Sequence, residues 1–160
     1  MFVSALRIAL AKSVAAPERT ALESALPAAE DLERIEAGFV QKINAGKAAR
    51  GEKPTQLPKA RKAQVRGYAD DAIAMQKEQL ASFESELNSR EIVSALHSGL
   101  QSDLQFWENS AKYAHPSDLP ILEEFVGAKQ RLFEALSRCL VAQAGNAAHV
   151  ASPQKQGVDR

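Results

Sequence analysis

Hydrophobic residues recur at helical spacing in five segments of the 160-residue chain, and the Gly and Pro residues fall between these segments or at their ends. A period near 3.6 residues is typical of helices that bury one face against a core. The pattern therefore predicts an all-α protein.

The first two predicted helices precede a loop. The first covers residues 2–15 and ends before Pro17, because a proline disfavours helical backbone at the residue before it. Residues 18–26 are interpreted as a short turn, with a helix as the alternative. Pro27 suits a first helical position, and Gly46 a C-cap, so the second helix is expected between them.

The third helix is predicted from about Pro58 to Leu87, after a basic loop at 46–58 that is rich in Gly and Pro. The hydrophobic stripe loses phase after Leu87. Asn88 and Glu91 then match the N-cap and N3 positions of a capping box. We therefore expect a tight turn at Asn88 rather than one very long helix.

The fourth helix is predicted over residues 89–114, and Ser117 or Asp118 can cap the fifth. Gly145 and the following asparagine are expected to end the fifth helix. The remaining residues, 146–160, have no apolar stripe and predict a disordered tail.

Three consecutive long amphipathic helices with short connections favour an up-down antiparallel bundle. The predicted fold is this bundle of the third, fourth and fifth helices, with one or two additional N-terminal helices lying across or extending it. It forms a single helical domain at residues 1–145, with a flexible basic loop at 46–58 and a disordered tail at 146–160.

Composition narrows the classes of function. Twenty acidic and twenty basic side chains cancel, so no global field attracts the protein to nucleic acid or membrane. The single cysteine, Cys139, excludes an intramolecular disulfide and a zinc finger, and it favours a reducing compartment such as the cytoplasm. No apolar run approaches the ~18 residues of an integral membrane segment.

Residues 1–17 allow two readings. They lack acidic residues and contain Ser, Arg and Lys, a composition shared with organelle-targeting segments. Arg7 and Lys12 disfavour a Sec signal, although export without one stays open. The favoured alternative is an ordinary first helix that packs Phe2 and Leu6, with Leu10, against the core.

The usual signatures of catalysis and metal binding are missing from the sequence. Residues 46–53 lack the Lys-Ser/Thr pair of a phosphate-binding loop, and no strand precedes them. His97 and His115 have no glutamate at the spacing of di-iron bundles. Cys139 lies beside an apolar stripe, where cysteine usually acts as a small hydrophobe. The sequence predicts a non-enzymatic protein with no cofactor or metal.

The fourth and fifth predicted helices are hydrophobic over unusually wide arcs, which implies burial on two sides. Either the N-terminal helices or another chain, including a second copy, covers the second side. Enrichment of aromatic residues at binding hot spots favours a partner. The predicted interface residues are Phe106, Trp107, Tyr113, Ile121, Phe125 and Leu132.

Residues 46–68 hold seven Lys or Arg and one Glu. Lys47, Arg50 and Lys53 are interpreted as solvated charges of the connector. Three further cations form a stripe at a helix start, where positive charge is unfavourable unless it is neutralised; they are Lys59, Lys62 and Arg66. The predicted counter-charge within the chain is the acidic group Asp118, Glu123 and Glu124.

These patterns predict a helical protein–protein interaction module, of the adaptor, regulator, secretion-associated or inhibitor kind. The alternative is a nucleic-acid-associated protein that uses the basic segment 47–66. That segment offers only Tyr68 for stacking against bases, which makes it the second choice.

Overall fold

The structure is a computed structural model that describes residues 1–52 and 73–151. Within these ranges the chain is helical and contains no strand. The elements are α1 (Phe2–Lys12), α2 (Ala16–Ala49), helical residues 73–85, α4 (Ser89–Ala111), the 3₁₀ turn η1 (Pro116–Asp118) and α5 (Leu119–Ala151). The all-α prediction is confirmed.

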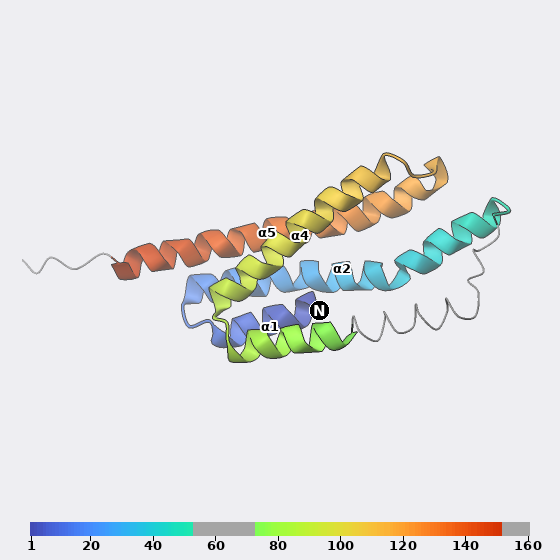
Figure 1. Cartoon of the computed structure of the whole chain (residues 1–160). Helices are drawn as coiled ribbons and strands as arrows, with labels where there is room; N and C mark the ends of the chain where they lie inside the picture. The colour runs from blue at the N-terminus through green and yellow to red at the C-terminus, as the bar shows by residue number, and fades with distance from the viewer. Residues whose placement is uncertain (53–72, 152–160) are drawn as a thin grey trace, which may run out of the picture.

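Successive helices of the described ranges run in alternate directions (Figure 1). α5 packs most extensively along α2 and then against α4, and α1 packs against both α2 and α4. The predicted three-helix bundle is not confirmed, because α2 is a full member of the packed core. Its buried stripe includes Leu22, Leu32 and Ile35.

The hydrophobic core joins all the long elements. Its largest fully buried side chains are Leu6 of α1, Leu22 and Leu32 of α2, Ile92, Val93 and Leu100 of α4, and Leu132, Leu136 and Cys139 of α5. Phe83 adds a buried ring from helical residues 73–85. α1 is thus integrated into the core, with Leu6 buried and Phe2 and Leu10 packed at its edge as predicted.

Pro27 lies inside α2, and the expectation that a helix begins there is wrong. A proline has no N–H to donate to the carbonyl four residues earlier, here that of Glu23. Packing of Leu22 before it and of Leu32 after it favours one continuous helix, since tertiary burial supplies most helical stability. Pro17 is the proline in the first turn of α2.

Replacing the internal proline, Pro27→Ala, is expected to raise the free energy of unfolding by about 2 kcal/mol. Proline costs ~3 kcal/mol relative to alanine inside a helix, and the freer unfolded chain offsets up to ~1 kcal/mol. Urea denaturation measures the change. Pro17→Ala is the matched control, since the first turn needs no N–H donor. Unchanged or lower stability of Pro27→Ala would contradict the argument.

The predicted ends of the second and fifth helices also differ from those in the structure. α2 passes Gly46 and ends at Ala49, and Gly51 supplies the left-handed conformation with φ of 71°. Gly46 instead permits close approach, because a Cβ there would lie 2.9 Å from Asp118 Oδ1. α5 continues past Gly145 to Ala151. The predicted flexible loop at 46–58 and disordered tail at 146–160 are therefore wrong at residues 46–49 and 146–151, which are helical. Residues 53–72, which include the rest of that loop and the start of the predicted third helix, and residues 152–160 lie outside the described ranges.

The turn before α4 is confirmed. The Asn88 side chain accepts a hydrogen bond from the Glu91 N–H at 2.9 Å, and the Glu91 carboxylate accepts one from the Asn88 N–H at 2.8 Å. The capping box therefore starts α4 at Ser89, as predicted. α4 ends at Ala111, slightly before the expected residue 114.

Two N-terminal cations bind the carboxyl ends of helices. Lys12 Nζ donates to the Phe83 carbonyl at 2.7 Å and to the Leu87 carbonyl. Arg19 donates to the Leu10 and Ser13 carbonyls at 3.1 and 3.0 Å. Positive charge at a helix C-terminus is favourable. Among the described residues, no helix has the length and hydropathy to cross a membrane.

Candidate functional site

The six predicted interface residues do not share one surface. Phe125 and Leu132 are 3% and 0% exposed and belong to the core. Trp107 and Ile121 are half-buried. Only Phe106 and Tyr113, at 61% and 90% exposure, present most of their side chains to solvent. Phe125 and Leu132 are therefore not available to a partner while the chain is folded.

An aromatic cluster explains much of the wide apolar arc on α4 and α5. Phe39 of α2 stacks on Phe125 with 4.4 Å between ring centroids, and it meets Trp107 edge to face at 5.4 Å. Trp107 and Phe125 lie 5.1 Å apart in a third edge-to-face contact. An N-terminal helix thus covers part of the second apolar side, the alternative that the sequence left open.

Lys129 is a buried cation that the sequence analysis did not single out. Its side chain is only 4% exposed, and Nζ lies 4.5 Å from the centroid of the Phe125 ring. The ammonium forms an ion pair with Asp103 of α4, whose side chain is 41% exposed. The signal in the sequence is a lysine one turn after Phe125, inside the apolar stripe.

Phe106 lies on one flank of α4, and Tyr113 lies in the turn just after the last helical residue, Ala111. The two residues are one heptad apart in sequence, and both side chains are exposed at the C-terminal end of α4. Glu108 and Ala111, which face the groove shared with α5, project about 180° away from Phe106 at ~100° per residue. We call the exposed surface of Phe106 and Tyr113 the aromatic face.

A groove between α4 and α5, here called the α4–α5 groove, has a volume of about 480 Å³. Its floor is apolar, and its rim carries two carboxylates and an amide. The lining residues are Glu108, Ala111, Leu122, Glu123, Val126, Gly127 and Gln130.

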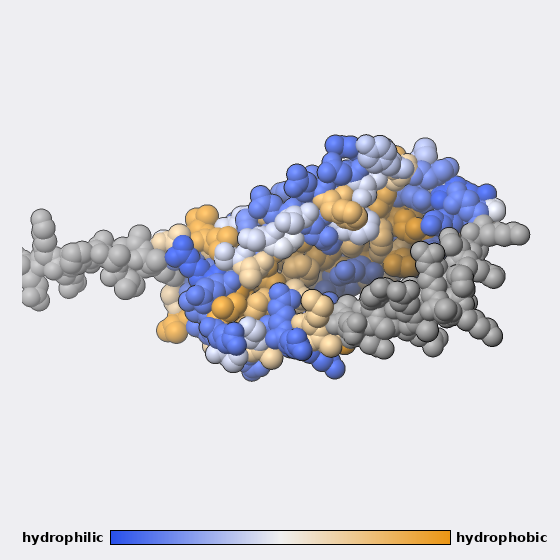
Figure 2. Space-filling view, in the orientation of Figure 1, coloured by the Kyte–Doolittle hydropathy of each residue, from blue (hydrophilic) through white to orange (hydrophobic). Residues whose placement is uncertain are grey.

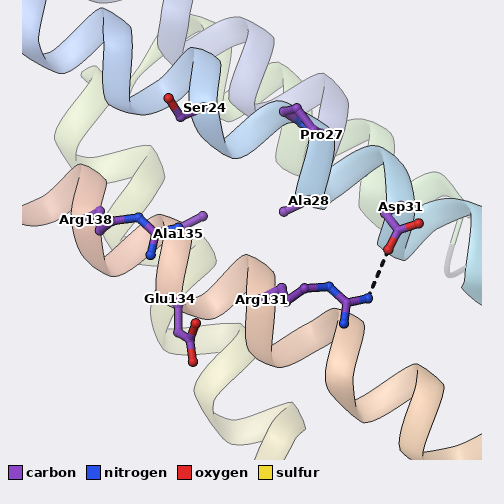
Figure 3. A pocket seen from close by; sticks show the side chains of 8 residues that line it. All are labelled: Ser24, Pro27, Ala28, Asp31, Arg131, Glu134, Ala135 and Arg138. Carbon is purple, nitrogen blue, oxygen red and sulfur yellow. Dashed lines mark hydrogen bonds and ion pairs between the residues drawn. The ribbon is translucent and has the colours of Figure 1, made fainter.

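A second groove, of about 510 Å³, lies between α2 and α5 and is more polar (Figure 3). Arg131 crosses it to Asp31 at 3.0 Å, and Asp31 also pairs with Arg34. Hydrogen bonds from Arg34 and then Arg131 lower the pKa of the Asp31 carboxyl. These charges are therefore largely satisfied within the chain.

The predicted acidic group meets cations of α2. Arg50 binds both carboxylate oxygens of Asp118, at 2.8 and 3.1 Å, and Lys42 binds Glu124 at 3.1 Å. The interpretation of Arg50 as a solvated connector charge is wrong, because its side chain is largely covered where α2 meets η1. The predicted cationic stripe, Lys59, Lys62 and Arg66, lies outside the described residues.

The Arg50 network makes stability depend on pH. Hydrogen bonds from Arg50 lower the pKa of Asp118 and of Glu52. A carboxylate with a lowered folded-state pKa stabilises the protein above its unfolded value, near 4, and loses this contribution as pH falls through the lowered value. The network should therefore stabilise the fold fully at neutral pH.

We expect Arg50→Gln to lower the free energy of unfolding at neutral pH, and the difference from the parent protein to shrink below pH ~4. Urea denaturation across this range measures both curves. Lys42→Gln is the control, because it removes an exposed pair of small expected effect at any pH. A difference for Arg50→Gln that does not change with pH would contradict this assignment.

The groups considered for catalysis or metal binding make contacts within the fold. His97 Nε2 contacts Ser137 Oγ at 3.0 Å, and its ring stacks on Phe133. His115 Nδ1 accepts from the Ser117 N–H at the start of η1. Burial raises the pKa of the Cys139 thiol to about 11, which disfavours the reactive thiolate. In the described ranges, no three His, Cys, Asp or Glu side chains form a metal-binding group.

Comparison of the chain with protein-family models, with curated proteins and with solved structures finds no match.

Proposed function

We propose that this protein is a non-enzymatic helical interaction module that binds another protein through the aromatic face of α4. The observation that supports this most directly is the exposure of Phe106 on α4 and of Tyr113 in the turn that follows this helix. Folding leaves these two rings largely in water, and burying them against a partner would be favourable.

The surroundings of the aromatic face fit a binding surface. A small hydrophobic spot lies over the distal half of α4 within a mostly hydrophilic surface (Figure 2). Phe106 also packs edge to face against Trp107, with 5.3 Å between centroids, so its ring is supported from the core side. A supported, exposed aromatic ring loses little conformational entropy on binding, which suits a hot spot.

The partner class stays broad within this proposal. An adaptor, regulator, secretion-associated protein or inhibitor would use such a face, and a second copy of the chain is one possible partner. A cytoplasmic location is part of the proposal and is supported by the single cysteine, which lies in the core and needs no oxidising environment.

Affinity capture from native lysate tests the proposal with paired baits. The test bait carries Phe106→Ser and Tyr113→Ser. The matched control carries Val14→Ser and Val141→Ser, which remove two other exposed apolar side chains elsewhere on the surface. We expect mass spectrometry to find proteins that the parent and control baits retain and the test bait loses. Light scattering on the same three proteins detects self-association. Identical capture and mass for all three would overturn the proposal.

The alternative, a nucleic-acid-associated protein, depends on the basic segment 47–66. Arg50 is engaged by Asp118, which removes one cation from that segment. We expect only weak binding of DNA or RNA at physiological salt. A micromolar or tighter complex that is lost on charge reversal of Lys59, Lys62 and Arg66 would favour the alternative.

A further inference from the structure

The α4–α5 groove combines an apolar floor with two carboxylates at its rim. Leu122 and Val126 of α5 and Ala111 of α4 line the floor. Glu108 stands on the α4 side and Glu123 on the α5 side, and both are exposed. Among the described residues, neither carboxylate lies within ion-pair distance of a cation. Two like charges therefore border one apolar depression.

Two described cations close to the groove residues in sequence donate to groups other than the rim carboxylates. Lys112, one turn after Glu108, donates to Asn109 Oδ1 at 3.1 Å. Arg131 lies behind Gly127 and is bound to Asp31. The neighbouring Glu124 differs from the two rim carboxylates because it forms an ion pair with Lys42. Within residues 1–52 and 73–151, no cation pairs with either rim carboxylate, so this part of the chain gives the groove a local negative field.

We propose that the α4–α5 groove binds a helical protein segment that carries a large apolar side chain flanked by Lys or Arg. The apolar side chain enters between Ala111 and Val126, as in helix-in-groove recognition. The cations meet Glu108 and Glu123, which sets the orientation and speeds association. This site is distinct from the aromatic face, since Phe106 and Glu108 lie on opposite flanks of α4, so it adds a second binding surface to the proposed function.

Gly127 offers a way to close the groove without disturbing the core. A Cβ at this position would meet only Arg131 Nη1, at 3.5 Å, which is an ordinary contact. Leucine is also a better helix former than glycine. Gly127→Leu should therefore fold normally and fill the groove. Gly38→Leu is the matched control, because it makes the same change in α2 where a Cβ meets nothing within 4 Å.

The test titrates the full chain into a fluorescein-labelled amphipathic helical peptide built from Leu and Lys, and measures fluorescence anisotropy. The same peptide with Glu at every Lys position is the second probe. We expect the basic peptide to bind and the acidic one not to bind. Gly127→Leu should weaken binding about tenfold or more, since the apolar anchor is excluded. Glu108→Gln with Glu123→Gln should weaken it several-fold and reduce its salt dependence.

Gly38→Leu and the exposed-acid control Glu36→Gln should bind the basic peptide as the parent protein does. Circular dichroism and urea denaturation confirm that each variant is folded. Failure of the basic peptide to bind at physiological salt, equal binding of the acidic peptide, or unchanged binding by Gly127→Leu would each overturn the proposal. None of these outcomes bears on the aromatic face, whose test uses other residues and another readout.

Discussion

Leu132→Ala is expected to lower the free energy of unfolding by about 2–5 kcal/mol, while Phe106→Ala changes it by no more than about 0.5 kcal/mol. Both residues were predicted to contact a partner. Leu132 is fully buried in the core, and truncating it removes buried apolar surface and leaves a cavity. Phe106 is 61% exposed, so its removal costs the fold little.

Urea denaturation followed by circular dichroism measures this contrast. Leu136→Ala is a matched control within α5, because Leu136 is equally buried and should show a similar loss. If Leu132→Ala were as mild as Phe106→Ala, then α5 would not face the core in the way described. A large loss for Phe106→Ala would instead show that the aromatic face is a folding contact.

Asp103→Ala is expected to destabilise the protein by about 2–4 kcal/mol, because it leaves the Lys129 ammonium buried without a counter-charge. Removing one partner of a fully buried pair typically costs ~3–5 kcal/mol, and the partial exposure of Asp103 reduces this figure. The contact of Lys129 with the Phe125 ring remains and compensates only in part.

Lys129→Met separates the charge of this side chain from its packing. Methionine fills a similar volume, and Asp103 can be hydrated once its partner is gone, so the expected change is within about 1 kcal/mol. The double variant, Asp103→Ala with Lys129→Met, should recover most of the stability lost in Asp103→Ala. The free energies of unfolding of the three variants form a double-mutant cycle. Additive losses would show that the two groups do not interact.

Pro17 and Pro27 have similar local sequence signals but occupy different positions in α2. Pro17 lies in the first turn of a helix, where its fixed φ and missing N–H are harmless. Pro27 carries the same local signal but lies inside α2. The difference arises because Leu22 and Leu32, on either side of Pro27, are both buried against other helices. A local cost of a few kcal/mol was offset by packing that no local pattern reports.

Some features of the candidate site were predictable from the sequence and others were not. The exposure of Phe106 follows from its position off the buried stripe of α4, whereas Tyr113 lies in the turn after the helix. The burial of Phe125 was not predictable, because it depends on Phe39, far away in the sequence, lying against its ring. The α4–α5 groove was missed because no single helix contains it. Its only signal was Gly127, a small residue within the apolar arc of α5.

The sequence by itself determined the helical class and the capping box at Asn88 and Glu91, because these depend on interactions within one or two turns. Only the tertiary structure decided which apolar stripes face each other, and that Arg50 is bound by Asp118 beside Gly46. Such contacts join residues far apart along the chain. Their free energy depends on geometry that exists only once the helices are packed together.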